Sequence, residues 1–220
     1  MRYFMGIDLG TSSVKALVID ENGGIVSGAQ EGYDIRKDKI EYAEQDIDAL
    51  WEATRKVIAG AVDSAPIGAG EIAGIGYSGQ MHGLVMVDRE GKPIRDAIIW
   101  ADQRSAGAIE EIYSIISREE YQPVSLNALS TGFLVSSLMW VKQNEPGNFE
   151  KIARVMLPKD YIRYKMCGLY GTDASDASSA AIFSKLCGSF IFTHISEDTR
   201  KPVLSAFRLT AWYSSRGIMR

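Results

Sequence analysis

The opening of this sequence constrains its fold most, because short apolar runs alternate there with turn-forming residues. Residues 3–8 form a short apolar run that is ended by Gly10, and residues 14–20 form a second run. The segment 21–24 holds an asparagine and two glycines, which accept the backbone angles of tight turns. Residues 25–30 then form a third run. We therefore predict that the chain opens as an antiparallel meander of strands.

Strand-like and helical patterns alternate through the rest of the chain as far as residue 183. The segment 44–46 offers a helix start, and apolar residues follow it at helical spacing from Leu50 to Val62. Alternation of this kind predicts an α/β protein, here with a mixed sheet. The other expected helices are 106–116, 135–143, 146–152, 159–166 and 174–183; the other expected strands are 72–77, 84–87, 97–100 and 155–157, with a turn at 89–93.

Composition and charge exclude several classes of protein. The chain has 220 residues, of which 46% are hydrophobic and 24% are charged, as in ordinary globular proteins. Its net charge is -4 without a long basic run, so we expect no nucleic-acid partner and no membrane partner. We find neither an apolar stretch of membrane-spanning length nor a signal peptide. Cys167 and Cys187 lack metal-like spacing, and we expect a cytoplasmic protein.

The segment from Asp8 to Ser13 has the residues of a phosphate-binding loop. Gly10 lets backbone N–H groups approach a phosphate, and the hydroxyls of Thr11, Ser12 and Ser13 add donors. Asp8 suits a Mg²⁺ ion held through water, because this ion keeps several waters and takes few carboxylates. The segment lacks the Walker P-loop pattern. The alternative is a hairpin with an ordinary Asp-x-Gly turn.

A second polar segment follows the strand expected at 72–77. Gln80 and His82 both donate and accept hydrogen bonds, and Met81 offers an adaptable apolar wall, which together suit the hydroxyls and C–H faces of a sugar. The alternative for His82 is a structural hydrogen-bonding role. Residues 74–79 also match Gly-x-Gly-x-x-Gly, but these glycines lie within the strand and do not open a helix. We therefore exclude a dinucleotide site.

A third segment holds Trp100, Asp102 and Arg104 between an expected strand and an expected helix. Trp100 can wall a sugar, whereas Asp102 and Arg104 can bind hydroxyls or pair with each other. The alternative is a helix N-cap at Asp102 with a buried ion pair. Two further segments, 157–161 and 172–177, open expected helices. We expect mainly structural, capping roles for their aspartates, Asp160, Asp173 and Asp176.

Together these segments resemble the FGGY carbohydrate kinases of the actin and hexokinase superfamily. Residues 6–12, Gly-Ile-Asp-Leu-Gly-Thr-Ser, are similar to the usual opening of that family, and residues 100–104 resemble its Trp-x-Asp-x-Arg element. Residues 80–83 look like xylulokinases, in which the Met-His pair meets the sugar. Gluconate kinases share part of this segment, and glycerol kinases carry a different sequence. The segments 157–161 and 172–177 also resemble xylulokinases.

The resemblance implies an actin/hexokinase (ribonuclease H-like) domain that uses ATP and Mg²⁺ to phosphorylate D-xylulose or a similar sugar. By resemblance, Asp8 acts with the metal through water, and Gly10, Thr11 and Ser12 contact the terminal phosphates of the nucleotide, with Ser13 beside them. The residues expected to bind the sugar are Gln80, Met81, His82, Trp100, Asp102 and Arg104.

The sequence also departs from the family in two ways. Ser137 stands three residues before Trp140, where the family usually has a lysine. The resemblance ends near residue 183, so we assign 1–183 to the N-terminal kinase domain and 184–220 to an atypical tail. The family continues into a C-terminal domain whose catalytic aspartate lies in a Gly-Gly-x-Asp context, and this context does not occur here. A shifted reading frame or a gene fragment is our hypothesis for the tail.

We favour the N-terminal half of a xylulokinase-like enzyme that is inactive alone and self-associates through the surface where a second domain would pack. One alternative is a non-catalytic sugar-binding remnant, and another is a fragment of a kinase for a different sugar such as gluconate. A further alternative is an actin-like or chaperone-like ATPase scaffold. The sugar-wall residues of segments 80–83 and 100–104 argue against that scaffold.

Overall fold

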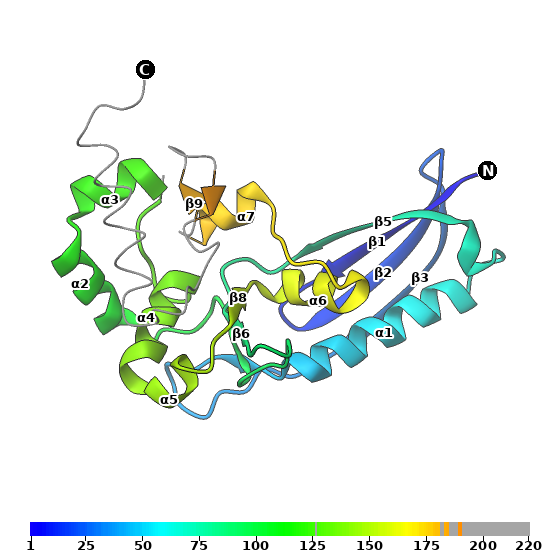
Figure 1. Cartoon of the computed structure of the whole chain (residues 1–220). Helices are drawn as coiled ribbons and strands as arrows, with labels where there is room; N and C mark the ends of the chain where they lie inside the picture. Colours follow the sequence, from blue (N-terminus) through cyan, green and yellow to red (C-terminus); the bar gives the residue numbers. More distant parts are fainter. Residues whose placement is uncertain (126, 181–182, 185–188, 191–220) are drawn as a thin grey trace, which may run out of the picture.

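A mixed four-stranded sheet forms one end of the molecule in the computed structural model, which describes residues 1–125, 127–180, 183–184 and 189–190 (Figure 1). Its strands, in the order β3-β2-β1-β5, are β1 (Tyr3–Leu9), β2 (Ser13–Asp20), β3 (Ile25–Gly32) and β5 (Ile72–Gly79). β2 pairs antiparallel with both β1 and β3, whereas β5 pairs parallel with β1. The predicted antiparallel opening and mixed sheet are confirmed.

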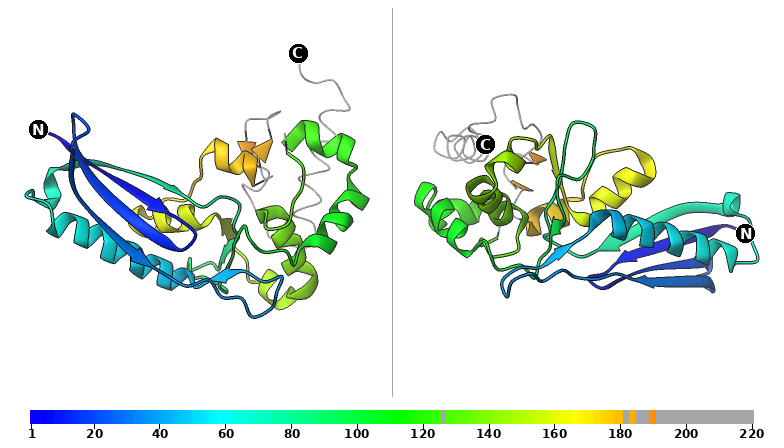
Figure 2. Two further views of the ribbon diagram at one scale, coloured as in Figure 1. Left: turned by 180° about the vertical axis from the view of Figure 1, so that it is seen from behind. Right: turned by 90° about the horizontal axis from the view of Figure 1, so that it is seen from below.

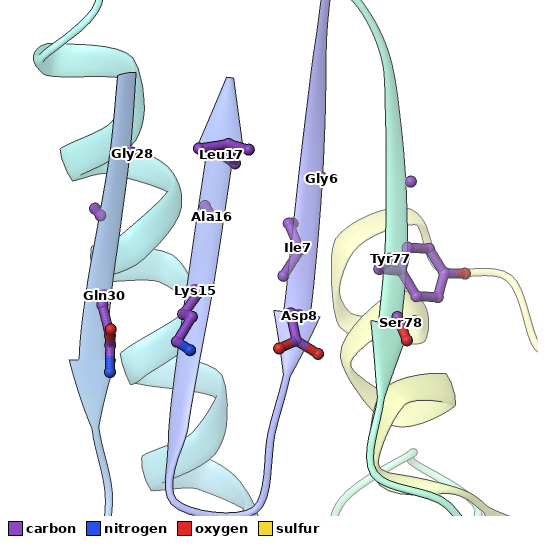
Figure 3. Close-up of a pocket in the computed structure, with 12 residues that line it drawn as sticks. Gly6, Ile7, Asp8, Lys15, Ala16, Leu17, Gly28, Gln30, Tyr77 and Ser78 are labelled. Atoms are coloured by element: carbon purple, nitrogen blue, oxygen red, sulfur yellow. The ribbon is translucent and has the colours of Figure 1, made fainter. Parts of the chain in front are cut away.

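One face of this sheet is covered by α1 (Ile47–Asp63), which runs along β2 and β3 (Figure 2). The helix buries residues at helical spacing against these strands. α6 (Pro158–Cys167) contacts both α1 and β5, so it lies on the same face, behind the strands in Figure 3. On the opposite, open face, Gly6 and Asp8 of β1 are exposed. The buried residues of α1 are Ile47, Leu50, Ala53, Thr54, Val57 and Ala61.

A second core lies at the other end of the molecule, among short helices (Figure 1). Leu84 and Ile98 reach this core from connecting segments and pack with Leu134 and Leu138 of its longest helix. In the part of the chain that the structure describes, no helix is long and apolar enough to cross a membrane. The helices here are α2 (Ala106–Ile115), α3 (Arg118–Ser125), α4 (Leu134–Asn144), α5 (Pro146–Phe149) and α7 (Ala174–Ser179).

Short strand pairs connect the two cores. β4 (Glu44–Gln45) pairs antiparallel with β7 (Ala97–Ile98), and β6 (Val85–Val87) pairs antiparallel with β8 (Arg154–Met156). The first of these pairs places residues 44 and 45 beside the segment that leads to Trp100. The remaining short elements are the 3-10 turn η1 (Ala69–Glu71) and the strands β9 (Phe183–Ser184) and β10 (Ser189–Phe190).

The structure corrects some of the predicted elements. The segments 84–87 and 97–100 do flank a turn, but a single isolated bridge, between Leu84 and Ile98, joins them, and their strand partners are β8 and β4. α3 was not predicted, because it contains Pro123, which lacks a backbone donor. The helix predicted for 174–183 ends at Ser179. Its last two residues are serines, which favour helix ends over helix interiors. Most of the predicted irregular tail, including 191–220, lies outside the described residues.

Replacing Asp46, the N-cap of α1, with alanine is expected to destabilise the fold. Its carboxylate accepts hydrogen bonds from the N–H groups of Asp48 at 2.9 Å and Ala49 at 3.0 Å. Loss of such a cap costs about 1 kcal/mol. The control Asp63→Ala removes the same charge from the exposed last residue of α1, where the helix dipole disfavours it. Urea unfolding should show a lower midpoint for Asp46→Ala alone, and equal losses would contradict the capping role.

Candidate active site

The carbonyl groups of the loop between β1 and β2 are held by hydrogen bonds from other segments. This loop of Gly10, Thr11 and Ser12 is called the phosphate loop here, after its predicted role. Its first carbonyl accepts from the Tyr33 hydroxyl, its second from Gln45 Nε2, and its third from the Tyr33 N–H at 3.2 Å. Carbonyl oxygens repel phosphate oxygens, so a loop whose carbonyls are already engaged suits an anion.

The donor groups of the phosphate loop remain available. Among the described residues, the backbone N–H groups of Gly10, Thr11 and Ser12 have no hydrogen-bond acceptor. The Thr11 hydroxyl accepts from Trp100 Nε1 at 3.0 Å, so it can still donate its own proton. A Cβ at Gly10 would lie 3.0 Å from the carbonyl oxygen of Ser13, so the close approach within the loop favours glycine.

Asp8 belongs to a row of polar side chains across the open face of the sheet (Figure 3). Gln30, Lys15, Asp8 and Ser78 are register partners on β3, β2, β1 and β5. They line a hollow of about 780 Å³ over this face. Asp8 is exposed, and burial together with the Asp8 charge raises the pKa of Tyr33 above its usual range. The Tyr33 hydroxyl therefore keeps its proton and continues to donate to the phosphate loop.

Residues 80–83, called the substrate loop here, follow β5 and lie beside the phosphate loop. Because β1 and β5 are parallel, both loops leave the sheet at the carboxyl ends of neighbouring strands, where α/β sheets bind ligands. The Gln80 N–H donates to the Leu9 carbonyl at 2.8 Å, and Gln80 Nε2 donates to Gln45 Oε1 at 2.6 Å. Gln80 is 8% exposed, and its Oε1 has no hydrogen-bond partner within the described part of the chain.

Met81 and His82 differ in how they are held. Met81 is 51% exposed. His82 has a φ of 69°, which makes it the one non-glycine residue with positive φ among those described, and its ring stacks on Phe133 with centroids 4.1 Å apart. This backbone conformation costs about 1–2 kcal/mol, so the surrounding structure must hold it. A ring fixed in this way agrees with either of the roles considered for His82, a sugar contact or a structural hydrogen bond.

Trp100 joins this group from the segment after β7. Its side chain is 49% exposed, and its indole N–H bonds to Thr11 as described above. Its backbone rests against Gly132, which has a φ of 71°. A Cβ at that position would lie 2.1 Å from the carbonyl oxygen of Trp100. The place of Trp100 therefore depends on a glycine at position 132.

Asp102 and Arg104 are buried and bond to each other. Arg104 Nε lies 2.8 Å from Asp102 Oδ2, and Arg104 Nη2 lies 2.6 Å from Glu44 Oε1. Asp102 also accepts from the N–H of Ala43 at 2.8 Å, and the two ion-paired side chains are 0% and 2% exposed. Of the alternatives considered above, the structure shows the ion pair. The N-cap of α2 is Ser105, so the helix-capping part of the alternative is not observed, because the Asp102 carboxylate bonds to Arg104 and Ala43.

Lys159 is buried at the start of α6 and gathers three carboxylates around its Nζ. The distances are 2.7 Å to Asp173, 3.0 Å to Asp160 and 3.2 Å to Asp176. Burial alone would lower the pKa of Lys159, but these interactions outweigh it and raise that pKa. Asp173 caps α7, as predicted, by accepting from the Asp176 N–H at 2.9 Å. Asp160 does not cap α6, whose N-cap is Leu157, because it bonds to Lys159 instead.

The sequence did not reveal three residues that hold the segments of the candidate site in place. Tyr33 and Gln45 bond to the phosphate loop, and Lys159 neutralises the acidic cluster. Tyr33 and Gln45 lie far along the chain from the motif that they support. Gln45 lies within the segment 44–46 that the sequence predicts as a helix start, and this position is the one signal that the sequence offers for it.

Substituting Gly132 with alanine is expected to displace Trp100 and destabilise the protein. The new Cβ meets the Trp100 carbonyl, and the positive φ adds strain, so we expect a loss of more than about 1 kcal/mol. Gly107→Ala is the matched control, because a Cβ there meets nothing within 4 Å inside α2, and it should stabilise by about 0.5–1 kcal/mol. Thermal unfolding should therefore move in opposite directions for the two variants; a stable Gly132→Ala variant would contradict this packing.

The Asp173 carboxylate is expected to contribute stability that is lost in acid. Burial would raise its pKa, but hydrogen bonds from Lys159 and Ser175 lower that pKa below its ordinary value. Such a group stabilises the fold above its unfolded pKa, and the contribution disappears as the pH falls through the folded pKa. Asp173→Asn keeps a good helix cap. Its deficit in unfolding free energy should therefore shrink below about pH 4, whereas a deficit that does not change with pH would contradict the ion pairing.

Comparison with protein families matches residues 3–185 to the N-terminal domain of the FGGY family of carbohydrate kinases. Xylulose kinase of Staphylococcus xylosus is 38% identical over 184 residues, which cover 84% of this chain and 38% of that protein. Xylulose kinase of Escherichia coli K12 is 33% identical over 175 residues, covering 80% of this chain and 35% of that protein. The chain thus spans less than two fifths of the length of these curated relatives.

Solved structures agree with this match. A xyloylose kinase from Brucella ovis is 35% identical with a TM-score of 0.78, covering 83% of this chain and 38% of that chain. A xylulose kinase from Rhodospirillum rubrum has a TM-score of 0.82 at 22% identity, covering 94% of this chain and 41% of that chain, and it supports the fold alone. The predicted actin/hexokinase-like fold and the resemblance on which it rested are confirmed. The chain belongs to the FGGY family of carbohydrate kinases.

Proposed function

We propose that this chain supplies the N-terminal half of the active site of an ATP-dependent sugar kinase that phosphorylates D-xylulose or a similar sugar. The observation that carries the proposal is the contact between the two loops. Gln45 bonds to both Thr11 and Gln80, and Trp100 bonds to Thr11. A phosphate-binding element and a polar wall therefore lie side by side, as transfer between two bound ligands requires. The xylulose kinases among its relatives favour a ketose such as D-xylulose.

The phosphate loop and Asp8 fit the triphosphate end of a magnesium nucleotide. The loop offers the N–H groups of Gly10 to Ser12 and the Thr11 hydroxyl, while its carbonyls are engaged elsewhere. One exposed carboxylate, Asp8, suits an ion that keeps most of its waters. When bound, Mg²⁺ would neutralise charge on the transferred phosphoryl group. In this proposal Asp8 holds the ion through water, and Ser13 lies beside the nucleotide.

The sugar wall is proposed to consist of Gln80, Met81, His82 and Trp100. The unpaired Oε1 of Gln80 is an acceptor that a sugar hydroxyl satisfies, and leaving such a buried atom unpaired is costly. The half-exposed Met81 and Trp100 offer apolar surfaces for the C–H faces of a sugar. Asp102 and Arg104 are not part of this proposed wall, because both are buried in an ion pair with each other.

The chain alone is proposed to bind ligands without rapid turnover. Phosphoryl transfer also needs a group that orients the attacking hydroxyl. The resemblance places that group, an aspartate in a Gly-Gly-x-Asp context, in a second domain outside residues 3–185. We therefore propose 1–183 as an N-terminal kinase domain of a cytoplasmic enzyme. The open sheet face, with Leu17 40% exposed and Ile75 45% exposed, supports self-association of the isolated chain.

Ligand binding can be measured through Trp100, because its indole bonds to the phosphate loop. In the purified chain, MgATP and D-xylulose should each change the tryptophan fluorescence, and Trp100→Phe should lose that change. Asp8→Asn should weaken MgATP binding about tenfold, as expected for loss of a charged hydrogen-bonding group, and leave D-xylulose binding intact. Asp20→Asn removes a charge from the opposite end of β2 and should alter neither affinity.

A coupled assay for ADP release then measures turnover with D-xylulose and with gluconate. We expect a rate far below that of an intact xylulokinase. A rate near that of the intact enzyme would contradict the half-site proposal. Failure to bind both MgATP and every sugar tested would contradict the site itself. Sugar binding without nucleotide binding would favour the non-catalytic remnant, and tighter binding of gluconate would change the sugar assignment.

A further inference from the structure

Gln45 lies between the phosphate loop and the substrate loop and bonds to both. Its side chain is buried, with 1% exposure. A carbonyl oxygen can only accept hydrogen bonds, so the contact with Thr11 O requires the nitrogen of the Gln45 amide. Its Oε1 therefore accepts from Gln80 Nε2 at 2.6 Å. The pattern of donors and acceptors thus runs in one direction, from Gln80 through Gln45 to Thr11.

The backbone on both sides of Gln45 is anchored. Gln45 pairs with Ala97 across the β4–β7 ladder. Glu44 accepts from Arg95, which also bonds to Glu145, and it lies 2.6 Å from Arg104 Nη2. On the other side, the next residue is the N-cap of α1. The side chain of Gln45 therefore starts from a fixed backbone, and the two loops are the parts that would move if its bonds were lost.

We propose that Gln45 is a positioning residue that sets the distance between the phosphate loop and the substrate loop. The inference rests on the proposed function, since it assigns to Gln45 the alignment of the nucleotide with the sugar. Alignment of this kind has a large effect on rate, because a misplacement of about 1 Å can cost about 100-fold. A side chain with a merely structural role would stabilise the core without fixing the loops to each other.

Two substitutions separate these roles. Gln45→Met keeps the length of the side chain and removes both hydrogen bonds. Gln45→Glu keeps the acceptor for Gln80, but its ionised carboxylate has no proton to donate to the Thr11 carbonyl. The matched control is Thr54→Val, which removes a buried hydrogen bond of 2.8 Å to Leu50 O within α1 and touches neither loop.

The indole N–H resonance of Trp100 reports the position of Thr11, because the two are hydrogen-bonded at 3.0 Å. Trp100→Phe assigns this signal among the tryptophans. In Gln45→Met we expect the resonance to shift, and the exchange of the Gln80 side-chain amide protons with solvent to rise about tenfold, because the hydrogen bond from Gln80 Nε2 is lost. Thr54→Val should lower stability without either change. Equal responses in the two variants would overturn the proposal.

A pH titration of Gln45→Glu gives a second test that holds even if Gln45→Met fails to fold. Burial and the Thr11 carbonyl should raise the pKa of the introduced carboxyl group above about 4.3. Once protonated, this group can donate again, so the Trp100 resonance should return toward its wild-type position as the pH falls. The wild-type spectrum at each pH is the reference, because the chain carries other carboxylates near this site, those of Glu44, Asp46 and Asp8. A resonance that stays displaced at low pH would overturn the proposal.

Neither readout needs a sugar or a nucleotide, so the two proposals can fail separately. If the Trp100 resonance does not shift as expected in the Gln45 variants, the positioning role is wrong. Ligand binding by the wild-type chain is then still tested by its own titrations with MgATP and sugars. Failure of the wild-type chain to bind MgATP and sugars would remove the proposed function, while the Gln45 link would still stand or fall on the shift of Trp100.

Discussion

The parallel pairing of β1 with β5 is the constraint on which the site depends. Parallel neighbours cannot be joined by a tight turn and need a long crossover, which here includes α1. The same helix covers one face of the sheet and supplies much of the core that lies between that face and the helix. The pairing also brings the ends of two strands distant in sequence to one edge. Gly79 permits this closeness, since a Cβ there would lie 3.0 Å from the Cβ atoms of both Leu9 and Lys159.

The opening of the fold was predictable because its pairings are local. The hairpins of β1, β2 and β3 follow from short apolar runs and a glycine turn. The turns and the need to bury one face of the sheet together fix the register of these strands. The partners of β6 and β7 were not predictable, because they lie at Met156 and Glu44, far along the chain. α3 was missed because its proline argues against a helix when it is considered alone.

The sequence predicts the motifs of the candidate site but not the contacts that support them. Residue type and spacing single out Asp8, the phosphate loop and the substrate loop as candidates, since these features lie within short segments. Asp102 and Arg104 could bind a ligand or each other, and the sequence left both open. What decides between these outcomes is Glu44, whose carboxylate reaches Arg104 and Arg95 from a different segment. Contacts of this kind come from the tertiary fold, so no local pattern encodes them.

The three engaged carbonyls of the phosphate loop have a consequence for how a ligand is captured. A loop tied at consecutive residues has little freedom left to lose, so its ordering adds little to the entropic cost of association. Arrival of an anion should then resemble docking onto a rigid surface, and differences in affinity among anions should appear mainly in how long each one stays. A closing motion on binding would then move other parts of the protein around a loop whose carbonyls are already held.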